Sequence, residues 1–586
     1  MVPVRASSNG VLLVVAISAA AFGLAVVGFS LPSGSVAAQT GEPVSYLPHL
    51  ASRGFTTALA IAPQGAGPRT ASPAAKRAPT GYRLSATAPG GGTLGIVGWG
   101  ESSIDLQSLV DGEYPCDIEL DSFVFDPLTI RRLMLPGGSH TVELKRIVGV
   151  TASTYSAVIH GGGNIAAVAR TNWEGGGAAA YLAPEVGAEL VLPLAMRDVY
   201  THSTLIQVVN TDPYGDNSVF MRSYMSNGAV RNEWEYVLWP GETGRIDPSY
   251  EAEFADLSME ALWFSADAPL SVMALGDEYN GRGVSSLRAR PPSAGSERQW
   301  LPFVRANMGG DTLIAVANVQ TAPVEATISY RGAPGSPSGA GRLFEQDVRI
   351  GPRSAVFIDL DVIKRRGNVE PPGLPRGARN GSGFFGSAEI VGDGPLLAAA
   401  WEQETTQVIT DIVASAAYNA FGPADLSATF AVPRVSYAVG GQTSQLVLQN
   451  PGEGAVEVSI DLVLPDGSTI GLPAETLGAG EMTVVPVALP APGVGQALIE
   501  ATEPIAVLVY DIGRDVDRTA YWAVKMPPEL IDLPERTPPP TPLPATATST
   551  PGDGTDAPTP GTGTPSATPP LDAPPAYLPM SWNPRR

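Results

Sequence analysis

An internal repeat constrains the fold of this chain more than any other feature. Each unit opens with an apolar residue and Pro, and after a short loop continues as a strand-like run that ends in Asn. The runs are Ser203–Asn210, Asp311–Asn318 and Thr443–Asn450, and Thr56–Pro63 is a degenerate copy in which Pro replaces Asn. Several elements recur in the same order in each copy, which predicts that the chain is built from copies of one module.

The element that follows each of these runs alternates between apolar and polar residues. In Ala455–Leu462, the apolar residues Val456, Val458 and Ile460 share one face, and the polar residues Glu457, Ser459 and Asp461 share the other. A period of two with one polar face predicts a half-buried antiparallel strand. Gly/Pro turns such as Pro240-Gly241 separate this strand from the next.

The last element of each unit is interpreted as a hairpin of two strands joined by a turn. The clearest copy is Gly386–Ile390 followed by Pro395–Glu402. Trp263 and Trp401 then fall in equivalent hairpin strands, which predicts a shared role in the core. The Asn that closes the first strand is interpreted as a turn-capping residue that tolerates a left-handed backbone, rather than as a ligand contact.

Six or seven short strands with turns between them predict an all-β fold of tandem immunoglobulin- or fibronectin-like β-sandwich repeats. The high content of Gly (65) and Pro (56) agrees with short strands and many turns. The expected modules are a degenerate first repeat at 39–174, which carries an insertion from Pro63 to about Pro127, and regular repeats at 188–290, 298–422 and 428–527.

The N-terminal residues 1–38 have the pattern of a secretory signal peptide. Arg5 supplies the positive charge, Val11–Phe29 is uncharged and apolar, and small residues precede a cleavage site near Ala37 or Ala38. The alternative is an uncleaved membrane anchor, because the apolar run nearly spans a bilayer. The single cysteine, Cys116, excludes an internal disulfide and is expected to be a small buried residue.

The C-terminal end is distinct in composition. Residues 528–576 are rich in Thr and Pro and lack the apolar mass to fold, which predicts a disordered stalk. The final segment 577–586 carries Tyr577, Leu578 and Pro579, a motif that copies the opening of a repeat. It is interpreted either as a sorting tag or as a strand that adds to a sandwich edge.

The net charge of −22 disfavours nucleic acid and anionic lipid as partners. The partners that remain are cell-envelope components, other surface proteins or polysaccharide. A membrane is expected to be contacted only through the N-terminal segment, if that segment is not cleaved.

No motif for catalysis or cofactor binding is found in the sequence. The four histidines lie in no metal-binding pattern, and there is no nucleophile elbow or phosphate-binding loop. Two acidic sets could bind calcium, Asp117 with Glu119 and Asp121, and Asp359 with Asp361, but solvated strand faces are the preferred interpretation. The sequence therefore predicts a protein without catalytic residues, bound metal or cofactor.

The repeat motifs and the tail together resemble exported repeat proteins of the Chloroflexota. In that group, repeats that open with an LPLV-like motif run into a T-I-VQN strand, and the chain ends in a Thr/Pro linker and a YLP motif. The matching stretches here are Leu192–Tyr200, Leu301–Arg305 and Tyr577–Met580. The resemblance implies export and display, without a particular ligand or reaction.

These observations favour a bacterial protein that is secreted or displayed at the cell surface. We expect a non-enzymatic structural or adhesion protein built from tandem β-sandwich modules. One alternative is an array of carbohydrate-binding modules, which requires solvent-exposed Trp or Tyr. A second is a secreted hydrolase, which requires a pocket with converging carboxylates or a Ser/His pair.

Overall fold

The chain is described by a computed structural model, and all of the described residues lie in the compact unit Pro43–Arg586. The described residues are 44–52, 86–87, 93–94, 100–108, 114–122, 125–134, 139–143, 153–160, 165–173, 178–199, 202–212, 214–246, 254, 258–278, 284–308, 310–360, 367–369, 373–374, 383–405, 412–439, 441–513 and 518–526. Within these ranges the structure consists of strands and turns, with two short 3-10 helices, η2 (Pro292–Ala294) and η3 (Pro423–Asp425). None of the helices described in these ranges has the length and apolar character needed to span a membrane.

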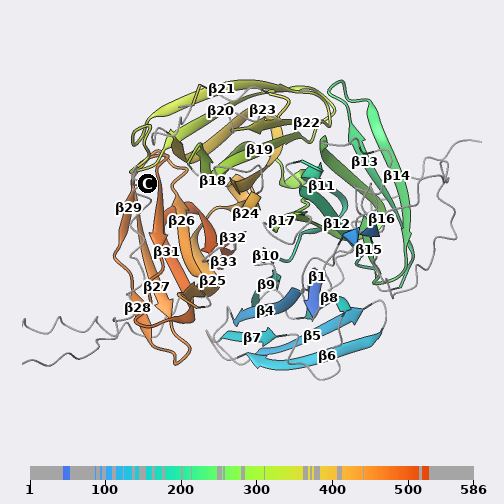
Figure 1. The fold of residues 1–586 in the computed structure, drawn as a ribbon, viewed down its shortest axis with the longest axis horizontal. Helices are drawn as coiled ribbons and strands as arrows, with labels where there is room; N and C mark the ends of the chain where they lie inside the picture. The colour runs from blue at the N-terminus through green and yellow to red at the C-terminus, as the bar shows by residue number, and fades with distance from the viewer. Residues whose placement is uncertain are drawn as a thin grey trace, which may run out of the picture. The chain divides into compact units, whose positions relative to one another are not determined.

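The strands form modules that follow one another along the chain, as the colours in Figure 1 show. The second module contains β11 (Val186–Arg197), β12 (His202–Asn210), β13 (Asn217–Tyr224), β14 (Val230–Leu238), β15 (Thr243–Ile246), β16 (Ser258–Glu278) and β17 (Ser285–Arg288). The third contains β18 (Ser296–Ala306), β19 (Gly310–Asn318), β20 (Val324–Gly332), β21 (Leu343–Ile350), β22 (Ala355–Asp359), β23 (Phe384–Thr405) and β24 (Ile412–Asn419).

The first and fourth modules have the same plan with small differences. The fourth contains β25 (Ser427–Tyr437), β26 (Thr443–Gln449), β27 (Val456–Val463), β28 (Thr469–Gly471), β29 (Glu475–Leu477), β30 (Met482–Pro486), β31 (Gly493–Ile512), β32 (Arg518–Trp522) and β33 (Val524–Lys525). The first contains β1 (Val44–Ser52), β4 (Gly100–Ser108), β5 (Tyr114–Ser122), β6 (Phe125–Met134), β7 (Ser139–Glu143), β8 (Ser153–His160), β9 (Ile165–Trp173) and β10 (Ala178–Leu182). A separate short pair, β2 (Ala86–Thr87) with β3 (Thr93–Leu94), lies in the predicted insertion.

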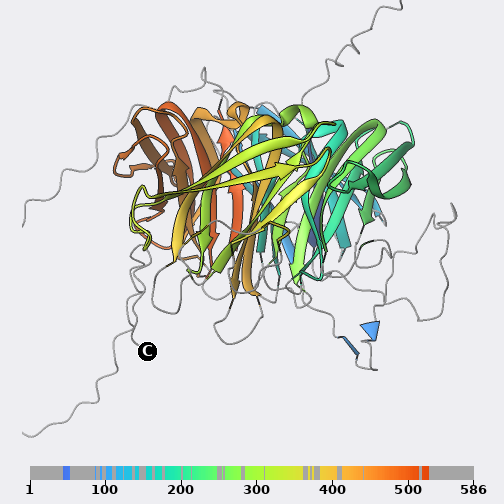
Figure 2. The ribbon, with the colours of Figure 1, turned by 90° about the horizontal axis from the view of Figure 1, so that it is seen from above.

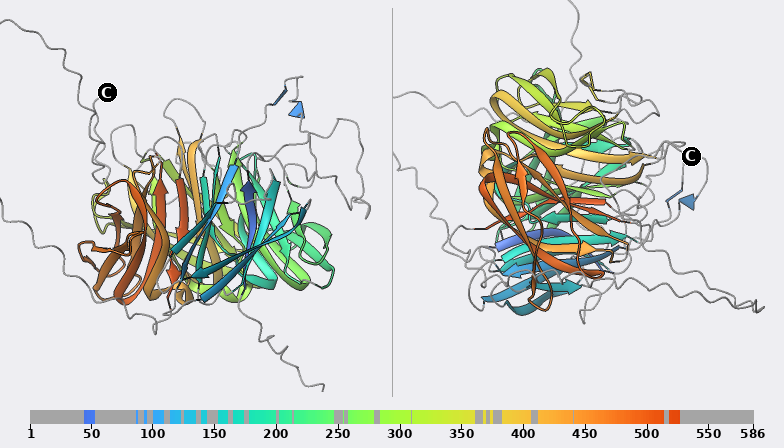
Figure 3. Two further views of the ribbon diagram at one scale, coloured as in Figure 1. Left: turned by 90° about the horizontal axis from the view of Figure 1, so that it is seen from below. Right: turned by 90° about the vertical axis from the view of Figure 1, so that its left-hand side faces the viewer.

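Each module is a sandwich of two antiparallel layers. In the second module one layer has the order β11-β16-β13-β14 and the other has the order β17-β16-β12-β15. The first module has the equivalent orders β1-β8-β5-β6 and β10-β9-β4-β7. Figures 2 and 3 show these layers from other sides. The prediction of an all-β chain of sandwich-like modules is confirmed.

The predicted hairpin at the end of each repeat is wrong. Residues 386–390 and 395–402 belong to one continuous strand, β23, and do not pair with each other. The pairing of β23 with β20 ends at Gly392, and its pairing with β19 begins at Leu396, so the strand passes from one layer to the other between them. Pro395 lies at this crossing, where its missing N–H interrupts no ladder.

The expected equivalence of Trp263 and Trp401 is also wrong, because they lie in different halves of their long strands. Trp263 lies in the half of β16 that pairs with β11, whereas Trp401 lies in the half of β23 that pairs with β19. Trp401 is fully buried in the core, and Trp263 is half-buried with its ring edge-to-face against Tyr224 at 5.2 Å. The two side chains therefore have different roles.

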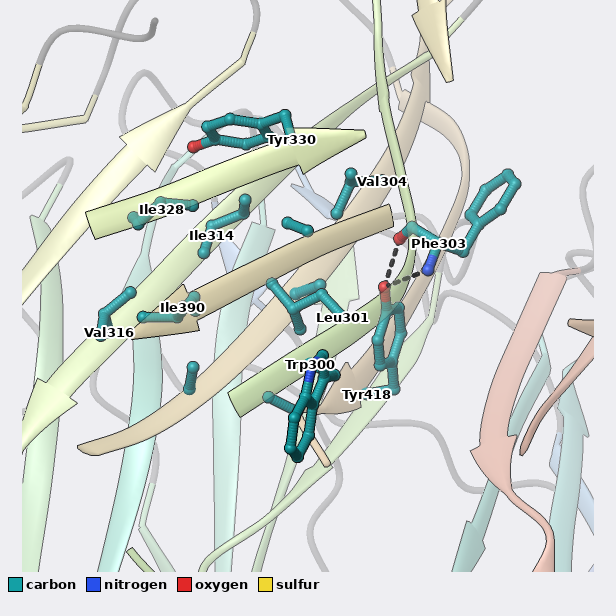
Figure 4. Packing of buried hydrophobic residues seen from close by; sticks show 14 of the residues in the cluster. Trp300, Leu301, Phe303, Val304, Ile314, Val316, Ile328, Tyr330, Ile390 and Tyr418 are labelled. Atoms are coloured by element: carbon teal, nitrogen blue, oxygen red, sulfur yellow. Dashed lines mark hydrogen bonds between the residues drawn. The ribbon is translucent and has the colours of Figure 1, made fainter. Parts of the chain in front are cut away.

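The alternating strands place their apolar residues between the layers as predicted. In the third module Leu301, Ile314, Ile328 and Ile390 come from four different strands and pack together (Figure 4). Burial of each such side chain contributes about 1.5–3 kcal/mol. One polar position differs from expectation, since Asp461 on the polar side of β27 is buried rather than solvated.

A left-handed turn joins the first two strands of three modules. Asp198, Asn307 and Ala438 have φ angles of 53°, 56° and 53° at equivalent places in this turn. A Ser, Thr or Asp side chain from the next strand accepts a hydrogen bond from the backbone N–H of each of these residues. Asn and Asp tolerate this conformation better than Ala does, so the fourth module has the least suitable residue.

We expect the substitution Ala438→Gly to raise the free energy of unfolding by about 1 kcal/mol, because glycine removes the strain of a Cβ at positive φ. Urea unfolding followed by tryptophan fluorescence measures the change. Ala479→Gly is the matched control, since Ala479 lies in an exposed turn and has no positive φ. A loss of stability in both variants would contradict the expectation.

Candidate functional site

The site residues predicted from the termini lie outside the described residues. These are Ala37 and Ala38 at the predicted cleavage site and Tyr577, Leu578 and Pro579 in the end motif, together with the predicted stalk. Cys116 and the acidic residues of 117–121 lie in β5, whose backbone alone is described. Asp359 is buried at the end of β22, so the expected solvated face is wrong there.

The apolar cores of the described modules continue from one module into the next. Leu313 and Trp401 of the third module pack in the core of the second, and Leu508 and Trp522 of the fourth pack in the core of the third. Val168 of the first module packs in the core of the fourth. The first and last modules are therefore in contact, and the modules share apolar cores rather than folding as separate units joined by linkers.

The last strand of each of the first three modules and β32 of the fourth module lie at these contacts. β17 contacts β10 and β24, and β32 contacts the same two strands, which closes a circuit of four strands from four modules (Figure 1). These strands carry small residues, as in Ala178–Leu182 with the sequence AAAYL and in Ile412–Asn419 with IVASAAYN. Small side chains let strands of different modules approach closely.

A buried ion pair joins the first module to the fourth. Arg170 of β9 donates from Nη1 to Oδ2 of Asp511 of β31 at 2.5 Å, and both side chains are almost fully buried. Asp511 also accepts hydrogen bonds from Ser444 and Thr519 of its own module. Because a buried carboxylate needs several donors, this arrangement fixes the contact between modules that are far apart in sequence.

A second buried pair lies within the third module, near the fourth. Arg305 donates from Nε to Glu402 Oε2 at 2.7 Å, and Thr312 donates to the other oxygen of Glu402. Burial is the largest single influence on the pKa of Arg305 and lowers it, but the charges of Glu402, Tyr510 and Glu404 and the hydrogen bond to Glu402 together hold that pKa above its ordinary value. Burial also raises the pKa of the Glu402 carboxyl, against the opposing charge of Arg305, so the hydrogen bonds from Arg305 and Thr312 are what hold this buried carboxyl group in place.

A third cluster draws residues from several modules. Arg290 binds Asp425 through two hydrogen bonds of 2.7 and 2.9 Å and also contacts Glu185 at 2.7 Å. Arg288 lies over the ring of Trp522, 4.6 Å from its centroid. Burial lowers the pKa of Arg288 to about 10, and the nearby charge of Arg290 acts in the same direction.

The same cluster includes Asn419 of the third module, which forms hydrogen bonds with the second module and with the fourth. Asn419 donates to the Arg288 carbonyl at 2.8 Å, and the indole N–H of Trp522 donates to the Asn419 carbonyl at 2.7 Å. These hydrogen bonds join the third module to the second and to the fourth. Among the described residues, no group of three or more His, Cys, Asp and Glu side chains is arranged to hold a metal.

The Asn at the end of β12 and of β19, and the Asn directly after β26, form the same buried network in these three modules. Asn318 donates from Nδ2 to the carbonyls of Ala322, Ile350 and Gly351 at 2.6, 3.4 and 2.9 Å, and its Oδ1 accepts from the N–H of Gln320 at 2.8 Å. Asn210 and Asn450 make equivalent bonds.

We call this network the Asn clamp. In each of the three modules it joins the loop that follows the Asn to the turn that precedes β15, β22 or β30, and we call these two segments the clamped loops. The expectation that Asn caps a turn is confirmed by these bonds. The expectation of a left-handed backbone is wrong, since Asn210, Asn318 and Asn450 do not have positive φ angles. The side chain, rather than the backbone conformation, explains why Asn recurs.

In the second module the clamped loops carry two exposed aromatic side chains. Tyr214 is 88% exposed, and Trp239 is 39% exposed. Asn210 donates to the carbonyl of Gly215, next to Tyr214, and to the carbonyl of Trp239 itself. The clamp therefore holds both residues at the same end of the module.

Comparison with known proteins finds matches among solved structures. No family model and no curated protein matches the sequence. A matching solved structure is described as "Crystal structure of tetra-tandem repeat in extending region of large adhesion protein". Its sequence is 10% identical, the match covers 74% of this chain and 96% of that chain, and the TM-score is 0.09. The strand pairing of this chain shows its fold, and the resemblance to Chloroflexota proteins stays a prediction.

We expect Arg170→Met to lower the free energy of unfolding by about 3–5 kcal/mol, because it leaves the carboxylate of Asp511 buried without its cation. The double variant Arg170→Met/Asp511→Asn should recover part of the loss, since the second change removes the unpaired charge. Urea unfolding of both variants measures the two effects.

Arg349→Met is the matched control, because Arg349 forms an exposed pair with Glu325 at 3.4 Å. An exposed pair contributes about 0–1 kcal/mol. If Arg349→Met and Arg170→Met had equal effects, the assigned role of the Arg170–Asp511 pair would be wrong.

We also expect Asn318→Asp to destabilise the chain by about 3 kcal/mol, since a carboxylate cannot donate to three carbonyls and would be buried among them. Thermal unfolding monitored by circular dichroism detects the loss. Asn227→Asp is the control, because exposed Asn227 uses only its oxygen, as the acceptor for the N–H of Ala229. A similar melting temperature for both variants would refute the role of the clamp.

Proposed function

We propose that this chain is an exported, non-enzymatic bacterial protein that is secreted or held at the cell surface, where its β modules form a rigid structural and adhesive unit. The observation that supports this most is the use of buried charges at the contacts between modules. Arg170 with Asp511 and Arg290 with Asp425 each join parts of the chain that are more than a hundred residues apart. Such ties suit a protein that must keep its shape outside the cell without disulfide bonds.

The termini support the same proposal from the sequence. The apolar segment that ends near Ala37 and Ala38 would direct export. The Thr/Pro-rich stalk and the motif beginning at Tyr577 would then separate the modules from their point of attachment. The partners proposed are cell-envelope components, other surface proteins or polysaccharide.

An array of carbohydrate-binding modules has weaker support. The clamped loops of the third and fourth modules have glycine, Gly351 and Gly478, at the place of Trp239. Among the three modules whose clamps are described, an exposed aromatic residue at this position occurs in the second alone, which favours one binding position over a repeated one.

Cell fractionation with mass spectrometry of the terminal peptides tests the proposal. We expect the protein in the envelope or culture-fluid fraction, with an N-terminus near Gln39, and we expect external protease to cleave it on intact cells. A cytoplasmic marker protein in the same samples is the control. Protein confined to the cytoplasm with an intact Met1 would refute the proposal. An intact Met1 in the membrane fraction would instead support an uncleaved anchor at the surface.

A further inference from the structure

We infer that the clamped loops of the second module bind a neutral glycan through Tyr214 and Trp239. This inference deepens the proposed adhesive function by assigning it a ligand class and a position. We call the two side chains the aromatic pair. Single exposed aromatic residues are common on proteins, so exposure alone does not make a site.

The first argument is the difference between equivalent loops of the repeats. In the third and fourth modules the Asn and its acceptor in the loop lie four positions apart, Asn318 with Ala322 and Asn450 with Gly454. In the second module they lie five positions apart, Asn210 with Gly215, and the longer loop presents Tyr214. The second module thus adds an aromatic residue on each of the two loops that the clamp joins.

The second argument is the surroundings of the Trp239 position. In the third module this position is Gly351, which packs so closely against the carbonyl of Ser226 in the second module that no side chain fits. The fold therefore requires glycine there. In the second module the same position carries the large side chain of Trp239, which remains partly exposed.

The third argument is that the backbone beneath the aromatic pair is fixed before any ligand arrives. Asp212 accepts from the N–H of Tyr214 at 2.8 Å, and Glu242 accepts from the N–H of Trp239 at 2.7 Å. The N–H of Gly241 donates to the Asp212 carbonyl at 3.1 Å, which ties one loop to the other. Rings held on a fixed backbone lose little conformational entropy on binding.

The charge around the aromatic pair selects the ligand class. Asp212, Asp216 and Glu242 are the charged residues of the two loops, and all are acidic. They disfavour phosphates, nucleic acids and acidic polysaccharides. Aromatic rings with polar tips suit a sugar ring, which offers an apolar face together with hydroxyl groups, so the ligand expected is a neutral oligosaccharide or polysaccharide.

Affinity electrophoresis of the purified full chain tests this inference. The native gels contain hydroxyethylcellulose, xyloglucan or galactomannan as neutral probes, and polygalacturonate as the anionic probe. We expect retardation by at least one neutral polysaccharide and none by polygalacturonate. Absence of retardation by all three neutral polymers, or stronger retardation by polygalacturonate, would overturn the inference.

Two variants locate the site. Trp239→Gly and Tyr214→Ala should each weaken binding about tenfold, as expected for the loss of an aromatic contact at the centre of an interface. Trp239→Gly should keep the fold, because Gly478 occupies the equivalent turn of the fourth module. Its urea midpoint checks this, and Leu343→Ala, which removes an exposed apolar side chain from the third module, is the control.

Unchanged retardation of folded Trp239→Gly would also overturn the inference. The gel assay uses purified protein, so its outcome does not depend on where the cell places the chain. A negative gel result with a surface location would therefore remove only the glycan site. A positive gel result with a cytoplasmic location would remove only the proposed surface function.

Discussion

The arrangement of the described modules depends on strands that belong to two layers at once. A sandwich must satisfy the backbone polar groups of both of its sheets, and β16, β23 and β31 do this by pairing first in one layer and then in the other. A strand of this kind cannot shift its register in one layer without shifting it in the other. The two halves of each module are thereby coupled through one continuous backbone.

The contacts between modules add a different kind of constraint. Shared apolar residues supply stabilisation, but apolar packing alone does not specify which module faces which. Buried charges do so, because a charge that loses its partner in a wrong arrangement is costly. Arg170 can be neutralised at its buried position by Asp511, and this requires the first module to meet the fourth in one orientation. The charged pairs therefore determine which modules meet and in which orientation, whereas apolar packing supplies most of the stability of the contacts.

The sequence predicted the features that repeat and missed those that join the repeats. Alternating segments such as Val456–Val463 identified strands, and Asn318 and its equivalents marked the loop ties, because their patterns are local. A proline between two apolar runs has the same pattern in a turn and at a change of layer, so the sequence predicts a hairpin where one strand crosses between layers. The pairing of Arg170 with Asp511 has no local pattern, since its partners lie 341 positions apart.

Because the modules repeat, a residue in one module can be compared with the residues at the equivalent position in the others, which a single domain does not allow. Where the same hydrogen bonds recur around Asn210, Asn318 and Asn450, the residues that make them are explained by the fold. A residue that differs at one copy of such a position is not explained in this way, and Trp239 in place of Gly351 or Gly478 is such a residue. Its exposed ring adds nothing to the clamp, whose bonds use only its backbone carbonyl. The clamp therefore does not account for the tryptophan side chain, whereas the inferred stacking of its ring on a sugar would account for it.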